Sequence, residues 1–337
     1  MRLAYLEPLY NVGMSDPVAN TVEKVLLAAP RGYCAGVDRA VQTVERTLEI
    51  HGPPVYVRKE IVHNKHVVQR LRERGVIFVE RETDVPEGSV CVFSAHGVAP
   101  SVHVNAQARE LQTIDATCPL VTKVHREALR FAEEGYTIVL VGHDGHEEVE
   151  GTMGEAPERI LLVQSEQDVD ELQVENPERI AYVTQTTLSV DETSSILARL
   201  KERFPALVGP RTDDICYATT NRQTAVKQLA GSCDLMLVIG SRNSSNSVRL
   251  VEVARDFGAD AHLIDSASEV REEWLTDKRV VGISSGASAP ENLVRELVGF
   301  FLERGVVDIS EVDAVKEDVR FMLPKQVREV IVAGEAS

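Results

Sequence analysis

Residues 24–48 read KVLLAAPRGYCAGVDRAVQTVERTL and predict a strand, a loop and a helix in that order. The apolar run Val25–Ala29 has the length of a buried strand. After the loop, apolar residues at 37, 40, 41, 44 and 48 follow the spacing of one helix face. Cys34 therefore lies where a loop opens a helix, a position at which the helix dipole favours the thiolate.

The same alternation of strand-length apolar runs and helical patterns continues along the chain. Helices are predicted from Pro119 to Gly135, after Ser189 with its capping partner Glu192, and from Pro290 to near Gly305. The further predicted strands are Val55–Val57, Ile77–Val79, Val90–Phe93, Thr137–Val141, Ile160–Val163, Ile180–Val183, Leu235–Ile239, His262–Ile264 and Val280–Ile283. This alternation predicts an α/β fold of parallel sheets covered by helices.

Three cysteines that precede helical patterns suggest an internal repeat. Cys34, Cys118 and Cys216 are 84 and 98 residues apart. A polar loop follows them 29, 28 and 30 residues later, at His63, His146 and Asn246. A second polar loop then follows in each part, namely Ser94–Gly97, Gln185–Thr187 and Ser284–Ser288. Any α/β chain shows loosely periodic loops, but three features recurring in the same order favour a repeat.

We therefore expect three similar α/β modules with mainly parallel sheets, arranged pseudo-threefold around a common centre. Open α/β sheets place ligands at the carboxyl ends of their strands, so facing modules would bring the three thiols together. We expect residues 1–23 to form an N-terminal extension and residues 310–337 to form a tail. The three modules between them are expected at 24–118, 119–216 and 217–309. The tail either packs as an arm or stays partly loose.

Composition and charge exclude several classes of protein. The chain of 337 residues carries 36 basic and 53 acidic groups, for a net charge of −17, which disfavours nonspecific nucleic-acid binding. No apolar run approaches the ~18 residues of a membrane span. The first residues lack the apolar core of a secretory signal. Five cysteines make a disulfide framework improbable and indicate a reducing cytoplasm.

The cysteines fall into two groups. Cys91 and Cys233 stand in or beside apolar strands, as small buried hydrophobic residues do. Cys34, Cys118 and Cys216 lie at loop-to-helix junctions and are candidate metal ligands. Three thiolates can hold zinc with a histidine as fourth ligand, or an iron–sulfur cluster with one iron left without a protein thiolate. Their spacing does not distinguish the two metals.

The polar loops suggest an anion-binding pocket. His63, His96 and His146 occupy equivalent places in the repeat scheme. Gly240–Asn246 and Ser284–Pro290 each join a strand to a helix and form candidate phosphate cradles. Nicotinamide and Walker-A fingerprints are missing from the sequence, so electrons for a redox reaction would come from a separate protein. His143, His146 and Glu148 leave a zinc hydrolase open, although the sequence lacks H-E-x-x-H.

Taken together, these segments resemble the IspH/LytB family of 4-hydroxy-3-methylbut-2-enyl diphosphate reductases. The matching stretches run in order through most of the chain: Pro30–Val37, Val62–Lys65, Phe93–Val98, Asp115–Val121, Gly142–Gly154, Thr184–Asp191, Asp213–Gln223, Gly240–Asn246 and Gly286–Pro290. The resemblance implies three α/β modules around a central iron–sulfur cluster with Cys34, Cys118 and Cys216 as its ligands. The cluster would be 4Fe-4S, or 3Fe-4S where the isolated protein has lost the labile iron.

The resemblance also implies the reaction and the roles of the pocket residues. The family removes the allylic hydroxyl of its substrate by two one-electron transfers and protonation, in the last step of the non-mevalonate isoprenoid pathway. A ferredoxin- or flavodoxin-type protein would donate the electrons, in the cytoplasm. Glu148 would be the proton donor, with His146 and Thr186 beside it at the hydroxyl end. The residues expected to hold the diphosphate are His63, His96, Ser244, Ser245, Asn246 and Ser288.

Two readings from other classes remain as alternatives. One is a zinc-dependent hydrolase that uses Cys and His ligands. The other is a non-catalytic iron–sulfur sensor, which would usually carry a basic nucleic-acid-binding module; none is visible in the sequence.

Overall fold

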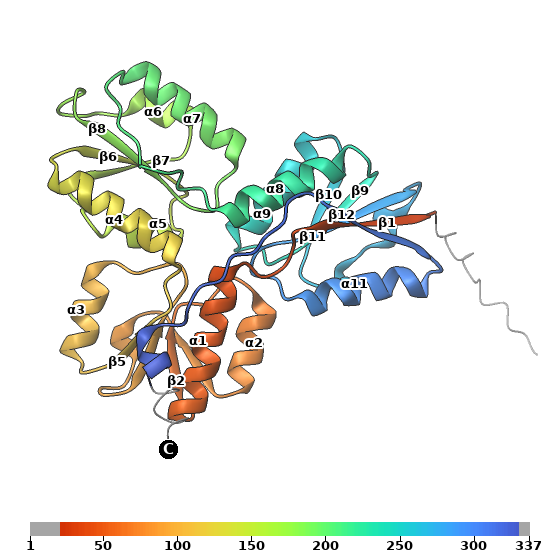
Figure 1. Cartoon of the computed structure of the whole chain (residues 1–337), viewed down its shortest axis with the longest axis horizontal. Coiled ribbons are helices and arrows are strands. Elements are labelled where there is room, and N and C mark those ends of the chain that lie inside the picture. The colour runs from red at the N-terminus through yellow and green to blue at the C-terminus, as the bar shows by residue number, and fades with distance from the viewer. Residues whose placement is uncertain (1–20, 330–337) are drawn as a thin grey trace, which may run out of the picture.

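A computed structural model describes residues 21–329 and places them in three lobes (Figure 1). Each lobe is built on one sheet, and every pairing between named strands is parallel. The expected α/β class with three parallel-sheet modules is thereby confirmed. The predicted terminal extension falls mostly outside the described residues, as do 330–337 of the tail.

The first sheet has the strand order β3-β2-β4-β5. Its strands are β2 (Val55–Arg58), β3 (Val76–Val79), β4 (Val90–Phe93) and β5 (Gln112–Asp115). The helices of this lobe are α1 (Ala35–His51), α2 (Lys65–Glu73) and α3 (Pro100–Ala108). The predicted apolar face of α1 packs into the core, where Ala40, Val41, Val44 and Leu48 are all buried.

The second sheet is the smallest, with the order β7-β6-β8. Its strands are β6 (Thr137–Val141), β7 (Ile160–Val163) and β8 (Ile180–Thr184). Its helices are α4 (Pro119–Glu133), α5 (Glu147–Met153), α6 (Glu166–Glu171) and α7 (Val190–Arg203). The Ser189 side chain caps α7 by accepting a hydrogen bond from the Glu192 amide, as the sequence predicts.

The third sheet contains strands from both ends of the chain, in the order β10-β9-β11-β1-β12. Its strands are β1 (Lys24–Ala29), β9 (Leu235–Ile239), β10 (Asp260–Ile264), β11 (Val280–Ser285) and β12 (Asp308–Asp313). Its helices are α8 (Tyr217–Ala230), α9 (Ser245–Asp256), α10 (Glu272–Leu275) and α11 (Glu291–Glu303).

The position of β1 differs from the expected division of the chain. Residues 24–118 were expected to form one module, but β1 pairs with β11 and β12 of the third sheet and has no partner in the first. An apolar run predicts a buried strand without specifying its neighbours, and Val25 and Ala28 are fully buried here. The divisions near 118 and 216 remain predictions.

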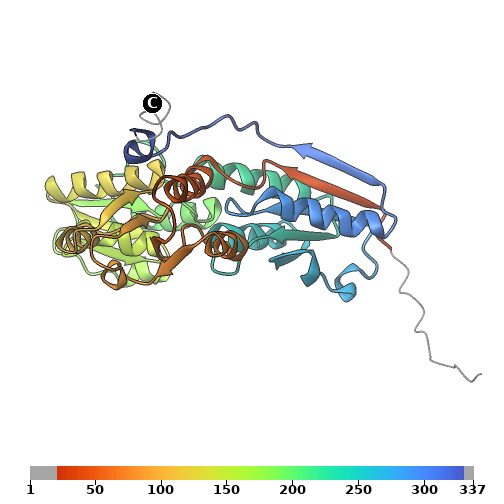
Figure 2. The same cartoon turned by 90° about the horizontal axis from the view of Figure 1, so that it is seen from below.

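The end of the chain crosses from the third lobe to the first (Figures 1 and 2). After β12, residues 314–323 run without helix or strand, and 325–329 are helical. Leu323 and Val327 pack into the core beside α1. We call residues 314–329 the C-terminal strap. This part of the tail is therefore an arm that packs on another lobe.

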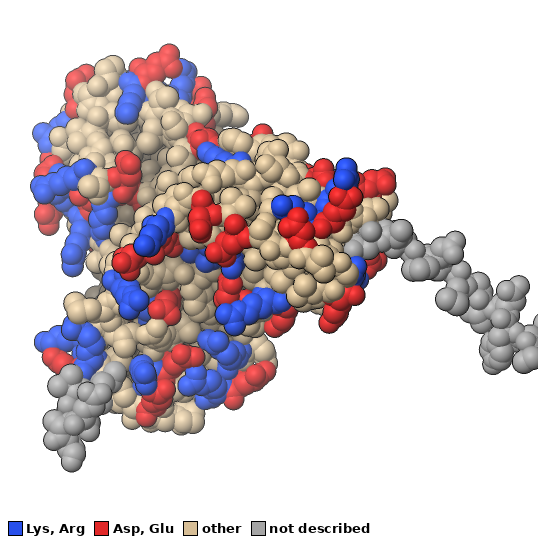
Figure 3. Space-filling model, turned by 45° about the vertical axis from the view of Figure 1, so that its right-hand side comes forward, with Lys and Arg blue, Asp and Glu red and all other residues tan. Residues whose placement is uncertain are grey.

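No helix within residues 21–329 combines the length and the apolar character needed to cross a membrane. Figure 3 shows acidic and basic side chains interspersed over one face of the molecule. Surface ion pairs join some of the acidic and basic side chains of the molecule, such as Arg46 with Glu49 and Arg199 with Glu202.

Candidate functional site

Each of the three candidate ligand cysteines is the residue that caps a helix. Cys34 precedes α1, Cys118 precedes α4 and Cys216 precedes α8, as the sequence predicts. The Cys34 sulfur accepts a hydrogen bond from the Val37 amide at 3.4 Å. The Cys216 sulfur accepts one from the Thr219 amide at 3.4 Å and lies 3.2 Å from the Thr219 hydroxyl. The three thiols thus stand at the N-termini of helices from three different lobes.

The three thiols meet at one cavity. A methyl group built on Gly36 would lie 2.7 Å from the Cys118 sulfur and 3.8 Å from the Cys34 sulfur, so both sulfurs adjoin the same glycine. Cys216 lines the same cavity as the other two. Cys91 and Cys233 do not line it, although all five cysteines are free.

The three thiols suit a cationic metal centre. Burial, together with the charge of a Cys34 thiolate, raises the pKa of Cys118 to about 12 and that of Cys216 to about 11. Backbone amides act in the opposite direction, so the expected stabilisation by the helix N-termini is present but outweighed by burial. A multiply charged iron centre reverses this balance by stabilising all three thiolates, which makes this donor set fit such a centre.

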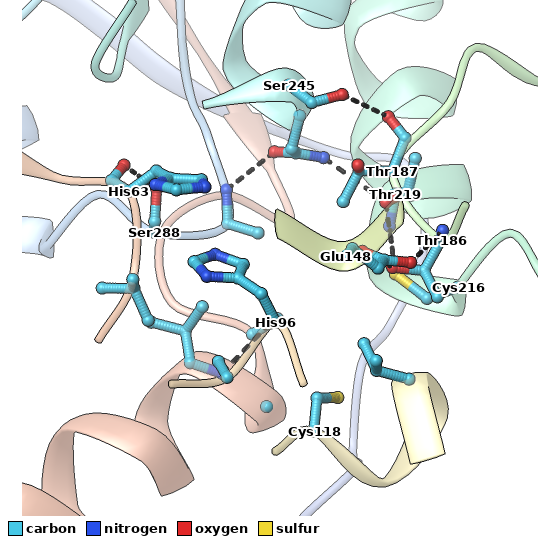
Figure 4. Close-up of a pocket in the computed structure, with 18 of the residues that line it drawn as sticks. His63, His96, Cys118, Glu148, Thr186, Thr187, Cys216, Thr219, Ser245 and Ser288 are labelled. Atoms are coloured by element: carbon cyan, nitrogen blue, oxygen red, sulfur yellow. Dashed lines mark hydrogen bonds between the residues drawn. The ribbon is translucent and has the colours of Figure 1, made fainter. Parts of the chain in front are cut away.

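All twelve site residues predicted from the sequence line this cavity (Figure 4). All but Cys216 stand in the loops after strands or in the first turn of the helix that follows, in all three lobes, as expected for open α/β sheets. Cys216 stands at the end of the loop between α7 and α8. They are Cys34, His63, His96, Cys118, His146, Glu148, Thr186, Cys216, Ser244, Ser245, Asn246 and Ser288.

Glu148 is the buried carboxyl group of the cavity, with an exposed fraction of 2%. One carboxylate oxygen accepts a hydrogen bond from the Thr186 amide at 2.6 Å, and the other accepts one from the Thr186 hydroxyl at 3.0 Å. Burial raises the pKa of Glu148 to about 7, although both hydrogen bonds from Thr186 act to lower it. The carboxyl group can therefore hold a proton near neutral pH and release it within the cavity.

Thr186 also ties the carboxyl group to a cysteine. Its backbone carbonyl accepts a hydrogen bond from the Cys216 amide at 3.1 Å. Glu148 on α5, the loop after β8 and the start of α8 are thus joined through one residue. This connection places the acidic group beside the thiols.

His146 is held as a neutral ring. Its Nδ1 accepts a hydrogen bond from the Glu148 amide at 3.1 Å and thereby caps α5. Burial, together with the charges of His96 and His63, lowers the pKa of His146 to about 3. Because Nδ1 is an acceptor, the proton of the neutral ring is on Nε2, which is left as a donor.

His63 and His96 stack on each other with ring centroids 4.0 Å apart. Each ring has a carboxylate partner: Glu60 lies 3.3 Å from Nδ1 of His63, and Glu147 lies 3.0 Å from Nδ1 of His96. Burial and the nearby His96 lower the pKa of His63. Ligand atoms of His63, His96 and Glu147 lie within 4.8 Å of one another, so this group can also hold a divalent cation.

The third lobe supplies uncharged hydrogen-bonding groups. The Asn246 side-chain oxygen accepts from the Ala287 amide at 2.8 Å, which joins the loops after β9 and β11. The Ser288 hydroxyl donates to the His63 carbonyl at 2.9 Å, and the Ser245 hydroxyl approaches the Thr187 carbonyl at 3.4 Å. Within residues 21–329, none of the side chains that line the cavity belongs to Lys or Arg. An anion bound here would meet hydroxyl, amide and imidazole donors.

The structure also shows site residues that sequence reasoning missed. Glu60 and Glu147 orient the two stacked histidines, and Thr219 contacts both Cys216 and Asn246. Thr219 could have been found, because it is the third residue of a helix capped by a candidate ligand. Glu147 carries no such signal, because its partner His96 is 51 residues away. Glu60 stands three residues before His63 in a loop, where sequence spacing does not predict a contact.

His143 does not join this group. It lies outside the cavity lining and contacts Gln185 and Arg249 instead. The combination of His143, His146 and Glu148 that left a zinc hydrolase open is therefore not assembled at this site.

Comparisons with known proteins agree on one family. The model of the LytB protein family matches residues 25–301. The 4-hydroxy-3-methylbut-2-enyl diphosphate reductase of Nocardia farcinica (strain IFM 10152) is 59% identical over 319 residues, which cover 94% of this chain and 95% of the relative. The reductase of the same name from Streptomyces avermitilis is 57% identical over 325 residues, 96% of each chain.

Two solved structures are also similar. The E-1-hydroxy-2-methyl-but-2-enyl-4-diphosphate reductase of Plasmodium falciparum has a TM-score of 0.91 and 38% identity, covering 93% of this chain and 99% of that one. An (E)-4-hydroxy-3-methyl-but-2-enyl diphosphate reductase, described as the terminal enzyme of the non-mevalonate pathway, has a TM-score of 0.61 and 32% identity, covering 84% of this chain and 100% of that one.

Proposed function

The chain belongs to the LytB protein family, and from this premise we propose that it is a 4-hydroxy-3-methylbut-2-enyl diphosphate reductase. The reaction breaks the allylic C–O bond of the substrate and consumes two electrons and two protons. Its products are water and isopentenyl or dimethylallyl diphosphate. The observation that carries the proposal is the single cavity in which three thiols, a buried carboxyl group and a set of neutral donors meet.

We infer that Cys34, Cys118 and Cys216 hold an iron–sulfur cluster, as 4Fe-4S with three protein ligands. The meeting of the three thiols at one cavity supports this assignment. When bound, such a cluster supplies the two electrons one at a time, together with a Lewis-acidic iron. In this enzyme the chain's own residues have to bind the diphosphate, exclude water and deliver protons.

The diphosphate end of the substrate is assigned to the side of the cavity formed by His63, His96 and the loops after β9 and β11. Ser244 caps α9, and Ser245 and Asn246 are its first two residues, so the N-terminus of this helix lies at the cavity. Ser288 follows β11 and is fixed to the carbonyl of His63. These neutral donors match the acceptor oxygens of a diphosphate, and the helix N-terminus adds a favourable partial charge.

The hydroxyl end is assigned to Glu148, Thr186 and His146, beside the thiols. A leaving hydroxyl group needs a proton, and protonated Glu148 is a suitable donor because its pKa is raised to about 7 by burial. Thr186 positions both carboxylate oxygens. His146, neutral and with Nε2 free to donate, is suited to hold the substrate oxygen in place.

We also propose that a ferredoxin- or flavodoxin-type protein donates the electrons, and that the enzyme works in the cytoplasm. Five free cysteines support a reducing compartment.

Anaerobic purification followed by iron and sulfide assay tests the cofactor, and reduction of the substrate by dithionite with a redox mediator tests the reaction. We expect a brown protein with about four iron and four sulfide per chain that forms both products. Colourless protein that contains zinc would overturn the proposal in favour of the hydrolase alternative. A full cluster without turnover would favour the sensor alternative.

A further inference from the structure

Each helix that begins at a candidate cluster ligand carries a basic residue about one and a half turns later. Arg39 is the fifth residue after Cys34, Lys123 is the fifth after Cys118, and Arg222 is the sixth after Cys216. None of the three lines the cavity, so none is available to bind substrate there. Their equivalent placement on α1, α4 and α8 suggests a shared role.

Each basic side chain donates hydrogen bonds to backbone carbonyls just before the next cysteine. Arg39 donates to the carbonyls of Ala116 and Thr117, at 2.9 and 3.0 Å, next to Cys118. Lys123 donates to the carbonyls of Thr212 and Asp213, at 2.5 and 2.8 Å, a few residues before Cys216.

The third contact closes the cycle. Arg222 donates twice to the carbonyl of Gly32, at 3.2 and 2.8 Å, two residues before Cys34. This is possible because β1, which leads into the Cys34 loop, belongs to the same sheet as the strands that follow α8. The three contacts therefore connect Cys34 to Cys118, Cys118 to Cys216 and Cys216 back to Cys34.

We propose that Arg39, Lys123 and Arg222 form a closed set of positioning residues, the cation ring, that fixes the three cysteine-bearing loops around the cluster and favours its reduced state by their positive charge. The inference rests on the proposed ligation of the cluster by the three cysteines. It assigns to these residues no contact with substrate.

The physical argument has a geometric part and an electrostatic part. A planar peptide whose carbonyl is held by a cation cannot rotate freely, and the amide of Cys118 is in turn bound to the carbonyl of Ala95 at 2.9 Å. The loop before each ligand is thus fixed from the helix of another ligand. Each electron added to a cluster makes it more negative, so nearby cations stabilise the reduced form.

Arg39 is the best member for an experiment because its hydrogen bonds go only to carbonyls, those of Ala116, Thr117 and Met322. Lys123 and Arg222 also pair with Asp214 and Glu317, so neutralising either would leave a carboxylate without its partner. Arg46 lies on the same helix as Arg39 and pairs at the surface with Glu49, which makes Arg46→Met a matched control.

The experiment compares wild type, Arg39→Met, Arg39→Lys and Arg46→Met after anaerobic reconstitution of the cluster. We expect Arg39→Met to lose iron to a chelator several-fold faster than wild type. We also expect its cluster to be harder to reduce. The equilibrium constant for reduction should fall by up to roughly tenfold, which lowers the reduction potential by about 59 mV for a one-electron couple. Arg39→Lys should restore the potential through its charge, and Arg46→Met should match wild type.

The possible results distinguish a failure of the cation ring from a failure of the cluster ligation that it depends on. Wild type that takes up no cluster would overturn the proposed ligation itself. Wild type with a full cluster, and Arg39→Met with the same iron loss and the same potential as Arg46→Met, would overturn the cation ring. A lower melting temperature of Arg39→Met with an unchanged reduction potential would mean that Arg39 only stabilises the fold. That result would also overturn the cation ring.

Discussion

At the scale of single residues, the two kinds of cysteine make the first distinction that can be measured. Cys34, Cys118 and Cys216 cap helices around one cavity, whereas Cys91 is buried on β4 and Cys233 lies beside β9. We expect the serine variants of the first three to lose most cluster iron and all activity, because serine replaces a thiolate ligand.

The control is built into the same protein. Cys91→Ser and Cys233→Ser should keep wild-type iron content after anaerobic reconstitution, since neither sulfur reaches the cavity. Iron and sulfide assays on all five variants decide the matter. Normal iron and activity in Cys118→Ser would rule out the three-ligand assignment.

Glu148 makes a pH-dependent prediction. Burial raises its pKa to about 7, and the protonated form is the one that donates, so turnover should fall as the pH rises through about 7. Glu148→Gln keeps the size and the hydrogen bonds of the group but removes the acid. We expect turnover to drop ~10²-fold or more, the scale of general acid catalysis, with the cluster intact.

The sign of the accompanying stability change follows from the same raised pKa. A carboxyl group whose pKa rises on folding stabilises the folded state at low pH, and this contribution is lost as the pH rises through the folded-state value. Glu148→Gln should therefore gain stability relative to wild type as the pH rises from the ordinary carboxyl pKa of 4.5 to about 7, and the difference should stay constant at higher pH. Wild-type turnover in Glu148→Gln at full cluster occupancy would assign proton delivery to another group.

Gly36 tests the close approach of the ligand loops. A methyl group at this position would lie 2.7 Å from the Cys118 sulfur, so Gly36→Ala must displace α1 or the sulfur. We expect reduced cluster occupancy in anaerobically reconstituted protein. Gly231→Ala is the control, because its added methyl group meets nothing within 4 Å. Equal iron content in both variants would contradict the close packing of Gly36 against the cluster site.

At the scale of elements, helices and strands with a clear apolar pattern are the ones that the sequence predicts. All ten strands expected from apolar runs are present, and Cys34, Cys118 and Cys216 do begin helices. Strands β5 and β12 were not predicted from the sequence. Each mixes one or two apolar residues with polar and acidic ones, as QTID in β5 and DISEVD in β12. Both lie at sheet edges, where a strand needs less apolar surface.

Local sequence patterns do not predict which elements contact one another. The list of cavity residues could be predicted because repeated loops end parallel strands and resemble a known family. The stacking of His63 on His96, the contact of His96 with Glu147 and the pairing of β1 with β11 depend on how separate segments meet in space. Sequence spacing carries no signal for such long-range pairs.

The loops after β9 and β11 should bind the diphosphate as a unit. Asn246 joins them through the Ala287 amide, and Ser288 joins them to His63. We expect Asn246→Ala and Ser288→Ala to weaken inhibition by inorganic diphosphate and to raise the KM, with His96→Ala acting in the same way. Each lost neutral hydrogen bond corresponds to about 1 kcal/mol, or roughly fivefold in affinity. Unchanged diphosphate affinity in all three variants would place the diphosphate elsewhere.

At the scale of the whole molecule, the C-terminal strap connects the third lobe to the first. Glu317 on the strap pairs at 2.9 Å with Arg222, whose side chain is fully buried, and it also accepts from Asn221. Further along, the carbonyl of Met322 accepts from Arg39, and Val327 is buried in the first lobe's core. The strap therefore contacts two of the three helices that begin at a cysteine.

Glu317→Gln should destabilise the folded protein, although residue 317 lies near the end of the chain. Arg222 is buried but the Glu317 side chain is 16% exposed, so the loss lies between about 1 kcal/mol, as for an exposed pair, and about 3–5 kcal/mol, as for a fully buried one. We expect a melting temperature several degrees below that of wild type. Glu329→Gln, which breaks only the exposed pair with Lys325, should stay within about 1 kcal/mol of wild type. If the two variants melt together, Arg222 is compensated by its carbonyl partners alone, and the strap is a passive covering of the fold.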